Sequence, residues 1–295
     1  MTADIETKVV PGPGGRELCL ELAGDPAGPT ILVHGGTPNS RHLSPDWISE
    51  AERRNLRLVS YDRPGYGRSS PDPGHSVADA AGDVRAIAQA IGCRRMATWG
   101  YSGGGPYALA CAALLPELTA AAATVGSIAP YGAPGLDYLA GTGDLNAEDI
   151  RLYFSDPEAA RTKAAADREE LLHATAEDVA AGLATLLSPA DAAVLTGAFA
   201  EFMVRCSQDG LAPGDQGWWD DGVAHLSPWG FEIASIPVPV KVWHGAQDRF
   251  VPFSHGEWLA AHVPGAEAEL SQVDGHLTLL VSKVGGVMDW LLERL

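Results

Sequence analysis

The sequence predicts an α/β fold with one helical insertion. Apolar, strand-like runs alternate with helical segments over residues 1–130, and strand and Gly/Pro turn signals return near Ile236. Between these regions, residues 131–235 show helical patterns with few strand signals. The chain has 295 residues, 46% of them hydrophobic, which is enough for one α/β core with an insertion. We therefore expect a core built from residues 1–130 and 236–295, with a helical segment over 131–235.

Each core element is predicted by a local pattern. Short apolar runs between turn signals are typical of strands, and apolar residues at i, i+4 and i+7 are typical of helices. The expected strands are 30–33, 56–60, 96–99, 120–126, 238–243 and, with a weaker pattern, 268–270. The expected helices are 76–91, 107–115 and a stretch after residue 276 in which Leu280, Val284, Val287 and Leu291 share one face.

The insertion carries helix signals of its own. Asp156-Pro157 and Ser188-Pro189 each combine an N-cap residue with proline at the first helical position. Farther on, Leu195, Phe199, Phe202 and Cys206 recur at helical spacing. Several helices are therefore predicted between residues 131 and 235.

The candidate site centres on Ser102, in the Gly-Tyr-Ser-Gly-Gly run at residues 100–104. This Gly-x-Ser-x-Gly pattern lies between a predicted strand and a predicted helix. A serine on so sharp a turn has strained backbone angles and crowded neighbours two positions away, and glycine at 100 and 104 meets that demand. The pattern predicts that Ser102 is a nucleophile.

A serine hydroxyl needs a base, and the base needs an acid that fixes its tautomer. Asp248 follows the predicted strand 238–243, and His276 precedes the last helical stretch. The order Ser102, Asp248, His276 is the nucleophile–acid–base order expected on this kind of sheet. We predict that these three residues form a catalytic triad.

Other acids and histidines fit these roles less well. The strand 120–126 is followed by no carboxylate until Asp137, which favours Asp248 as the acid. Asp274 lies two residues before the predicted base and is interpreted as shaping its loop. His34 and His244 each precede a glycine at a strand end, and we interpret both as packing groups.

A tetrahedral intermediate also needs donors for its negative oxygen. The N–H of Gly103, directly after the nucleophile, is one candidate. The other should come from an early strand-end loop, and the His-Gly-Gly-Thr-Pro run at residues 34–38 has that form. Since glycine lets a backbone N–H face the site without a side chain in the way, we predict Gly36 as the second donor.

Taken together, these pieces resemble the α/β-hydrolase family. The resemblance rests on His34-Gly35-Gly36, the run Tyr61–Ser69, the turn around Ser102, the Asp248 loop and His276. It implies a mostly parallel eight-stranded sheet with helices on both faces, a serine triad, an oxyanion hole and no cofactor. It also implies that residues 131–235 are a helical cap over the active site. The run 62–69 is mainly structural in this family, and we assign it no chemistry.

The chain departs from two subgroups of that family. Relatives that cleave N-terminal proline carry a proline directly after His-Gly-Gly, where this chain has Thr37. Dehalogenases and epoxide hydrolases use an aspartate nucleophile, where this chain has Ser102. The sequence therefore predicts a serine hydrolase acting on a small carboxylic ester, thioester or lactone.

Other activities stay open on the same triad. They are aminopeptidase or amidase activity, carbon–carbon bond hydrolysis and perhydrolysis, and a ligand-binding protein that keeps the fold is a further alternative. Amide cleavage would predict a cap carboxylate for an amine, with Asp220 or Asp221 as candidates. The neighbouring Trp218 and Trp219 would then line a substrate pocket, whereas the simpler interpretation is packing between cap and core.

Charge and cysteine content limit the partners and the compartment. The net charge of −18 comes from dispersed carboxylates and disfavours nucleic acid and anionic membranes. The four cysteines, Cys19, Cys93, Cys111 and Cys206, show no metal-ligand spacing, so we expect free thiols and no metal. Residues 1–15 contain no apolar signal segment, and no run reaches transmembrane length. We expect a cytoplasmic protein with a small-molecule substrate, and the oligomeric state stays open.

Overall fold

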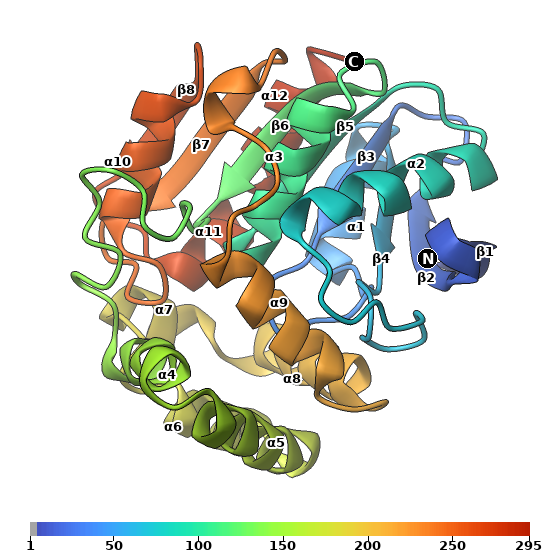
Figure 1. Cartoon of the computed structure of the whole chain (residues 1–295). Coiled ribbons are helices and arrows are strands. Elements are labelled where there is room, and N and C mark those ends of the chain that lie inside the picture. Colours follow the sequence, from blue (N-terminus) through green and yellow to red (C-terminus); the bar gives the residue numbers. More distant parts are fainter. Residues whose placement is uncertain (1–4) are drawn as a thin grey trace.

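Apolar runs in the two core segments form the strands of one eight-stranded sheet. The structure is a computed structural model that describes residues 5–295. The strand order is β1-β2-β4-β3-β5-β6-β7-β8, and all neighbours from β4 to β8 are parallel, whereas β1–β2 and β2–β4 are antiparallel (Figure 1). The strands are β1 (Glu6–Pro11), β2 (Glu17–Gly24), β3 (Thr30–His34), β4 (Arg57–Tyr61), β5 (Met96–Tyr101), β6 (Thr119–Val125), β7 (Val240–Gly245) and β8 (Glu267–Ser271).

Alternating side chains of the central strands pack against helices on the two faces of the sheet. Ile31 and Val33 of β3 join a buried cluster with Trp47 of α1 and Leu291 of α12, whereas Leu32 joins a cluster on the opposite face. The core helices are α1 (Pro45–Arg53), α2 (Ala80–Ala90), α3 (Gly105–Leu114), α10 (Phe253–His262), α11 (His276–Ser282) and α12 (Val284–Leu292). Short 3₁₀ segments are η1 (Pro13–Gly15), η2 (Val77–Asp79), η3 (Ser102–Gly104) and η4 (Ile233–Ser235). The predicted fold class is confirmed.

Helices alone fill the segment between β6 and β7. They lie beyond one end of the sheet, with α9 between the core and the group formed by α4, α5 and α6 (Figure 1). Their bounds are α4 (Asp144–Ser155), α5 (Pro157–His173), α6 (Ala176–Gly182), α7 (Pro189–Val194), α8 (Gly197–Leu211) and α9 (Gln216–Leu226). All six fall within residues 131–235, and we keep the name cap for that segment, whose status as a separate domain stays a prediction.

Both predicted helix starts in the cap are confirmed. α5 begins at Pro157, where the Asp156 carboxylate accepts the Ala159 N–H at 3.0 Å. α7 begins at Pro189, where the Ser188 hydroxyl accepts the Asp191 N–H at 3.2 Å. In each case the side chain satisfies one of the free N–H groups of the first turn.

One predicted helix is in fact two. The stretch after residue 276 is divided into α11 and α12 around Lys283. Glycines at 285 and 286, which disfavour helix, lie at the start of α12. The residues of the predicted apolar face still point into the core despite the division into two helices. All four are buried, namely Leu280, Val284, Val287 and Leu291. Leu195 likewise precedes α8 instead of belonging to it, yet is buried.

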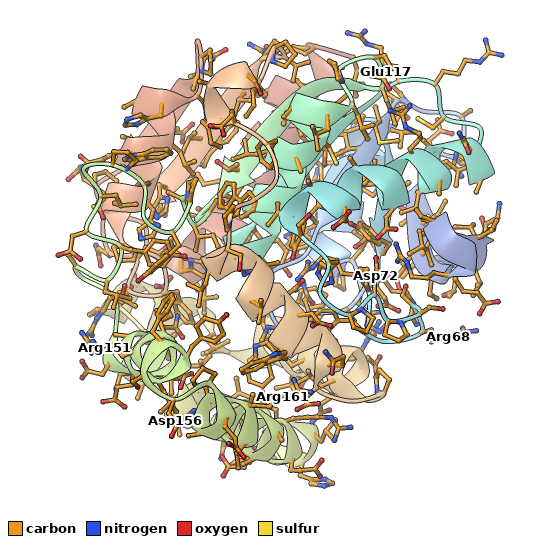
Figure 2. The ribbon with its side chains drawn as sticks, viewed as in Figure 1. Arg68, Asp72, Glu117, Arg151, Asp156 and Arg161 are labelled. Carbon is orange, nitrogen blue, oxygen red and sulfur yellow. The ribbon has the colours of Figure 1, made fainter. Side chains whose placement is uncertain are left out.

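Charged side chains cover the outside of the cap, and one of them joins two cap helices. Arg161 of α5 lies beside α9, where it bonds to Asp215 at 3.1 Å and its guanidinium carbon lies 5.1 Å from the Trp219 ring centroid (Figure 2). Within residues 5–295, no helix combines the length and apolarity needed to cross a membrane. All four cysteines are free thiols.

Candidate active site

The turn after β5 holds Ser102 in an unusual backbone conformation. Its φ is +52°, in the left-handed region that non-glycine residues rarely adopt. A Cβ placed on Gly100 would lie 2.2 Å from the Gly104 carbonyl oxygen, and one on Gly104 would lie 2.2 Å from the His34 carbonyl oxygen. Only glycine fits at either position, as the sequence pattern predicts.

Three neighbouring parallel strands bring the candidate residues to one edge of the sheet. Tyr101 of β5 pairs with Val125 of β6, which in turn pairs with Trp243 of β7. Ser102 therefore follows the carboxyl end of one strand, and Asp248 follows the carboxyl end of the next strand but one. Ligands of open α/β sheets bind at this edge.

Asp248 and His276 form a short, buried hydrogen bond. The His276 Nδ1 and the Asp248 Oδ2 lie 2.6 Å apart. The other carboxylate oxygen of Asp248 accepts the N–H groups of Phe250 at 2.9 Å and Val251 at 2.8 Å, which fixes the carboxylate in its loop. Since the carboxylate faces Nδ1, the proton resides on Nδ1 and leaves Nε2 free to act as a base.

The surroundings of His276 favour its charged form. Burial disfavours an imidazolium, but the charge and hydrogen bond of Asp248, with a smaller contribution from Asp191, raise the pKa of His276 above its ordinary value. The Phe250 ring stacks on the imidazole with 4.7 Å between centroids, which fixes the plane of the ring. No hydrogen bond joins Ser102 to His276 in the described part of the chain, so this contact stays a prediction.

Asp191 of the cap helix α7 is a further residue at the base, and sequence reasoning missed it. Its fully buried carboxylate accepts the backbone N–H groups of His276 at 3.0 Å, Leu277 at 2.7 Å and Thr278 at 3.1 Å. A carboxylate at a helix N-terminus satisfies free donors and complements the helix dipole. Asp191 therefore links the cap to the helix that begins at His276, the predicted base. The Ser188-Pro189 signal located α7 but gave no indication of a partner 85 residues away.

The two predicted oxyanion donors flank the nucleophile. Gly103 directly follows Ser102, and a Cβ placed on Gly36 would lie 3.4 Å from the Ser102 Cβ and 2.8 Å from the Tyr101 ring. Gly36 thus lies against the serine side chain with no room for a side chain of its own. The roles of both N–H groups stay predictions.

Histidines 34 and 244 are buried packing groups, as predicted. The His34 ring stacks on Tyr107 at 6.3 Å, and burial, with the nearby Arg63 charge, lowers the pKa of His34 to about 3. Burial also lowers the pKa of His244, whose Nε2 donates to the Val251 carbonyl at 2.9 Å. Both are therefore neutral at pH 7.

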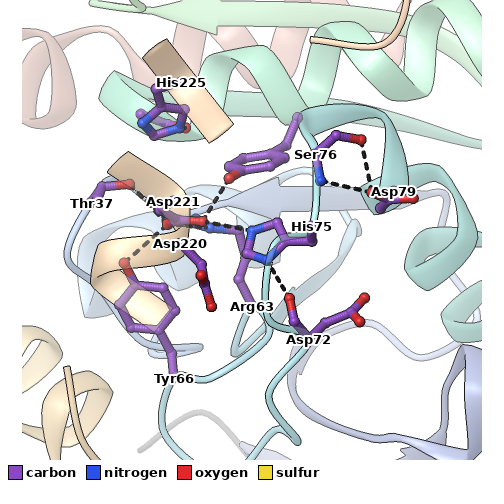
Figure 3. A network of polar contacts seen from close by, with 12 residues as sticks. Thr37, Arg63, Tyr66, Asp72, His75, Ser76, Asp79, Asp220, Asp221 and His225 are labelled. Atoms are coloured by element: carbon purple, nitrogen blue, oxygen red, sulfur yellow. Dashed lines mark hydrogen bonds and ion pairs between the residues drawn. The ribbon is translucent and has the colours of Figure 1, made fainter. Parts of the chain in front are cut away.

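The Trp-Trp-Asp-Asp motif of α9 is divided between two environments. Trp218 and Trp219 line a cavity of about 150 Å³ between α4, α5 and α9. Asp221 faces the core, is fully buried and bonds to Arg63, so it is not free to bind a substrate amine (Figure 3). Asp220 is 6% exposed and accepts the Gln216 amide at 2.8 Å. The structure therefore favours the packing interpretation for the two acids.

Among residues 5–295, no group of three His, Cys, Asp or Glu side chains is placed to hold a metal ion.

Comparison with known proteins agrees with this architecture. The family described as alpha/beta hydrolase fold matches residues 29–282. A non-heme chloroperoxidase of Streptomyces lividans is 27% identical over 88% of this chain and 89% of its own length. A bifunctional esterase/perhydrolase of Acinetobacter calcoaceticus is 28% identical over 76% of each chain. The crystal structure of a hydrolase from Pseudomonas aeruginosa PA01 has a TM-score of 0.71 at 21% identity, covering 97% of this chain and 98% of that one. The chain therefore belongs to the alpha/beta hydrolase fold family.

Proposed function

We propose that the protein is a serine hydrolase that cleaves a small carboxylic ester, thioester or lactone. The observation that carries the proposal is the buried 2.6 Å bond between His276 and Asp248, at the sheet edge where the strained Ser102 turn lies. A base oriented by a carboxylate beside a serine on such a turn is the arrangement for acyl transfer.

In the first half of the reaction, the Ser102 oxygen attacks the substrate carbonyl carbon while His276 Nε2 takes the hydroxyl proton. The N–H groups of Gly36 and Gly103 hold the negative oxygen of the tetrahedral intermediate. His276 then gives its proton to the leaving alcohol, thiol or lactone oxygen, and an acyl-enzyme remains on Ser102. Asp248 stabilises the imidazolium throughout this half.

In the second half, water attacks the acyl carbon and His276 accepts its proton. Collapse of the second tetrahedral intermediate releases the carboxylic acid, and the proton returns from His276 to Ser102. The same histidine serves both halves because giving its proton to the leaving group leaves Nε2 free to act as a base again.

Perhydrolysis is a second candidate, supported by the relative named an esterase/perhydrolase. Hydrogen peroxide would replace water in the second half, so that its oxygen attacks the acyl-enzyme and a peroxyacid leaves. The same triad and the same proton transfers serve both reactions. Peroxyacid formation from an ester and hydrogen peroxide, measured beside ester hydrolysis, distinguishes the two.

Labelling with a fluorophosphonate probe tests the nucleophile. We expect one probe per chain on Ser102, mapped by peptide mass, with no labelling of Ser102→Ala and little of His276→Ala. The Ser102→Ala variant should keep its circular dichroism spectrum while losing ester turnover. Wild-type turnover retained by Ser102→Ala would exclude the proposed nucleophile. A panel of esters, thioesters and lactones then identifies the substrate class.

A further inference from the structure

A single buried arginine holds the loop that carries the predicted Gly36 donor. Arg63, on the loop after β4, donates through Nη1 to the Gly35 carbonyl and through Nη2 to the Gly36 carbonyl, the latter at 2.6 Å. Its Nη2 also lies 2.9 Å from the Thr37 hydroxyl. Three consecutive residues beside the nucleophile are thus bound by one planar guanidinium, whose donors are fixed relative to one another.

The Gly35 carbonyl matters because it belongs to the same peptide group as the Gly36 N–H. In a planar trans peptide the C=O and the N–H point in opposite directions. Fixing the carbonyl on the Arg63 side therefore fixes the direction of the Gly36 N–H on the other side. A positively charged donor on the carbonyl also polarises the peptide and strengthens its N–H as a donor.

Arg63 is itself held by the cap. The Asp221 carboxylate of α9 bonds to Arg63 Nε at 3.0 Å, and both side chains are buried (Figure 3). The same carboxylate accepts the hydroxyl groups of Tyr107 at 2.6 Å and Tyr66 at 3.0 Å. Against the cost of burial, the Arg63 charge holds the pKa of Asp221 well below its usual range, so the pair is ionised. The cap and the loop of residues 35–37 are therefore joined by this ion pair and by the Thr37 hydroxyl, which donates directly to Asp221 at 3.2 Å.

One turn later, α9 contacts the other predicted donor residue. His225 lies four residues after Asp221, on the same face of the helix. Its Nε2 donates to the Gly103 carbonyl at 2.9 Å. Burial lowers the pKa of His225 to about 4, which keeps it neutral and able to donate from Nε2 alone. α9 thus reaches both sides of Ser102.

We propose that Arg63, fixed by Asp221 of the cap helix α9, is a positioning residue that orients the Gly36 N–H toward the oxyanion. This inference rests on the proposed function, because it concerns the same acyl-transfer site. It gives a role to Arg63, to which sequence reasoning assigned no chemistry, and to Asp221, which sequence reasoning considered only as a partner for a substrate amine.

The test removes the ion pair without leaving a buried charge unpaired. Loss of one partner alone would destabilise the protein for reasons unrelated to the oxyanion. In the double variant Arg63→Met/Asp221→Asn both charges are absent. Because Tyr107 and Tyr66 donate to different oxygens of Asp221, the asparagine oxygen still accepts from one of the two tyrosines, and its amide nitrogen faces the other. The control is Arg16→Met/Asp83→Asn, which removes another ion pair, between Arg16, directly after η1, and the buried Asp83 of α2, with 2.6 Å between its charged atoms. Arg16 also pairs with Asp72, which is 39% exposed and can be solvated when the arginine is lost. Folding is checked by circular dichroism and thermal unfolding.

The readouts separate transition-state from ground-state binding. Loss of one oxyanion donor lowers kcat by about 10²–10³-fold in known cases, and for a misdirected donor we expect about 10- to 100-fold. KM for a small p-nitrophenyl ester should change by less than about twofold, since the donor acts in the transition state. The inhibition constant of a trifluoromethyl ketone, whose adduct places an oxyanion in the hole, should rise by the same factor as kcat/KM falls.

Each result decides the proposal. A double variant that folds but has wild-type kcat and ketone affinity overturns it, as does a control variant that loses as much kcat. If the double variant does not fold, Arg63→Lys is measured in the same way. A lysine keeps the charge but presents its donors from a single atom, whereas Arg63 reaches Asp221, Gly35 and Gly36 from three separate nitrogens. Wild-type kcat in that variant therefore overturns the proposal too. Wild-type protein that neither turns over esters nor labels on Ser102 overturns the proposed function itself, and this inference with it.

Discussion

At the scale of single residues, His276 is the group whose environment is most specific. Its Nδ1 bonds to the Asp248 carboxylate, and the Phe250 ring stacks on its imidazole. Its backbone N–H donates to a second carboxylate, that of Asp191. Each contact leaves Nε2 free, so together they fix the ring without occupying its basic nitrogen. The balance between burial and the Asp248 charge places its pKa above the ordinary histidine value.

In the proposed mechanism, that raised pKa sets the pH dependence of ester turnover. The base must be neutral, so kcat/KM should fall as pH drops through the His276 pKa, and this loss should begin above the ordinary histidine value of 6.5. Asp248→Asn should lower kcat by about 10³–10⁴-fold and shift the acid limb to lower pH, because the stabilising charge is gone. Steady-state kinetics from pH 5 to 9 measures both effects. An acid limb that does not move in the variant contradicts the assigned pair.

Gly36 permits a second test at this scale. A Cβ there would lie 2.8 Å from the Tyr101 ring, so Gly36→Val should displace the loop from the nucleophile. We expect kcat to fall by about 10²-fold or more, approaching the loss of one oxyanion donor. Substitution at Gly182, where a Cβ would meet nothing within 4 Å, is the control. Equal activity of the two variants would exclude Gly36 from the site.

At the scale of elements, short helices of the cap control the ends of core elements. α7 supplies the carboxylate on the N-terminus of α11, and α9 supplies the carboxylate that holds Arg63. In the first case a carboxylate of the cap accepts backbone N–H groups of the core. In the second, a carboxylate of the cap binds an arginine that itself donates to backbone carbonyls of the core. The cap is therefore part of the framework that positions the site.

Asp191→Asn tests the link between α7 and α11. Asparagine keeps one acceptor oxygen but loses the charge, so we expect a loss of about 1–2 kcal/mol in the free energy of unfolding. The charge of Asp191 raises the pKa of His276, in addition to the larger effect of Asp248. The acid limb of kcat/KM should therefore move to lower pH.

The matched control for that variant is Asp156→Asn, at the start of α5. Asp156 also accepts a backbone N–H of a first turn, at 3.0 Å, but lies on an exposed helix. We expect a similar kind of stability loss without any movement of the pH profile. If both variants leave the acid limb unchanged, Asp191 affects stability alone.

Local patterns explain how much of this site was predictable from sequence. The Ser102 turn and the two glycines beside it are set by residues close together in the chain, so the sequence predicts them. Asp248 and His276 were predicted one by one, each from its place on a loop after a strand. Asp191 and Arg63 could not be found in this way, because their partners lie 85 and 158 residues away. Nothing in the local pattern around either residue specifies which distant group it meets, a backbone N–H for Asp191 and a carboxylate for Arg63.

At the scale of the whole molecule, burial is unevenly distributed. Every residue of β3 and β6 is buried, whereas α5, with 17 residues, and α6 contain no fully buried residue. Because hydrophobic burial is the main source of stability, these two helices contribute less of it per residue than the central strands.

Hydrogen exchange should reveal this difference. We expect the amides of α5 and α6 to exchange through local opening, with lower protection than those of β3 and β6, which should open only with global unfolding. Mass spectrometry of exchanged peptides measures it. Equal protection of α5 and β6 would mean that cap and core unfold as one unit.

The pairing of Arg63 with Asp221 has a consequence for protein engineering. In a chimera whose cap is taken from a relative, residue 221 would be replaced and residue 63 kept, since residue 221 lies in the cap and residue 63 in the core. Such a graft would leave a buried guanidinium without its counter-ion, even where every substrate-facing residue was well chosen. Libraries of cap variants built on this protein should therefore vary positions 63 and 221 together, as one pair.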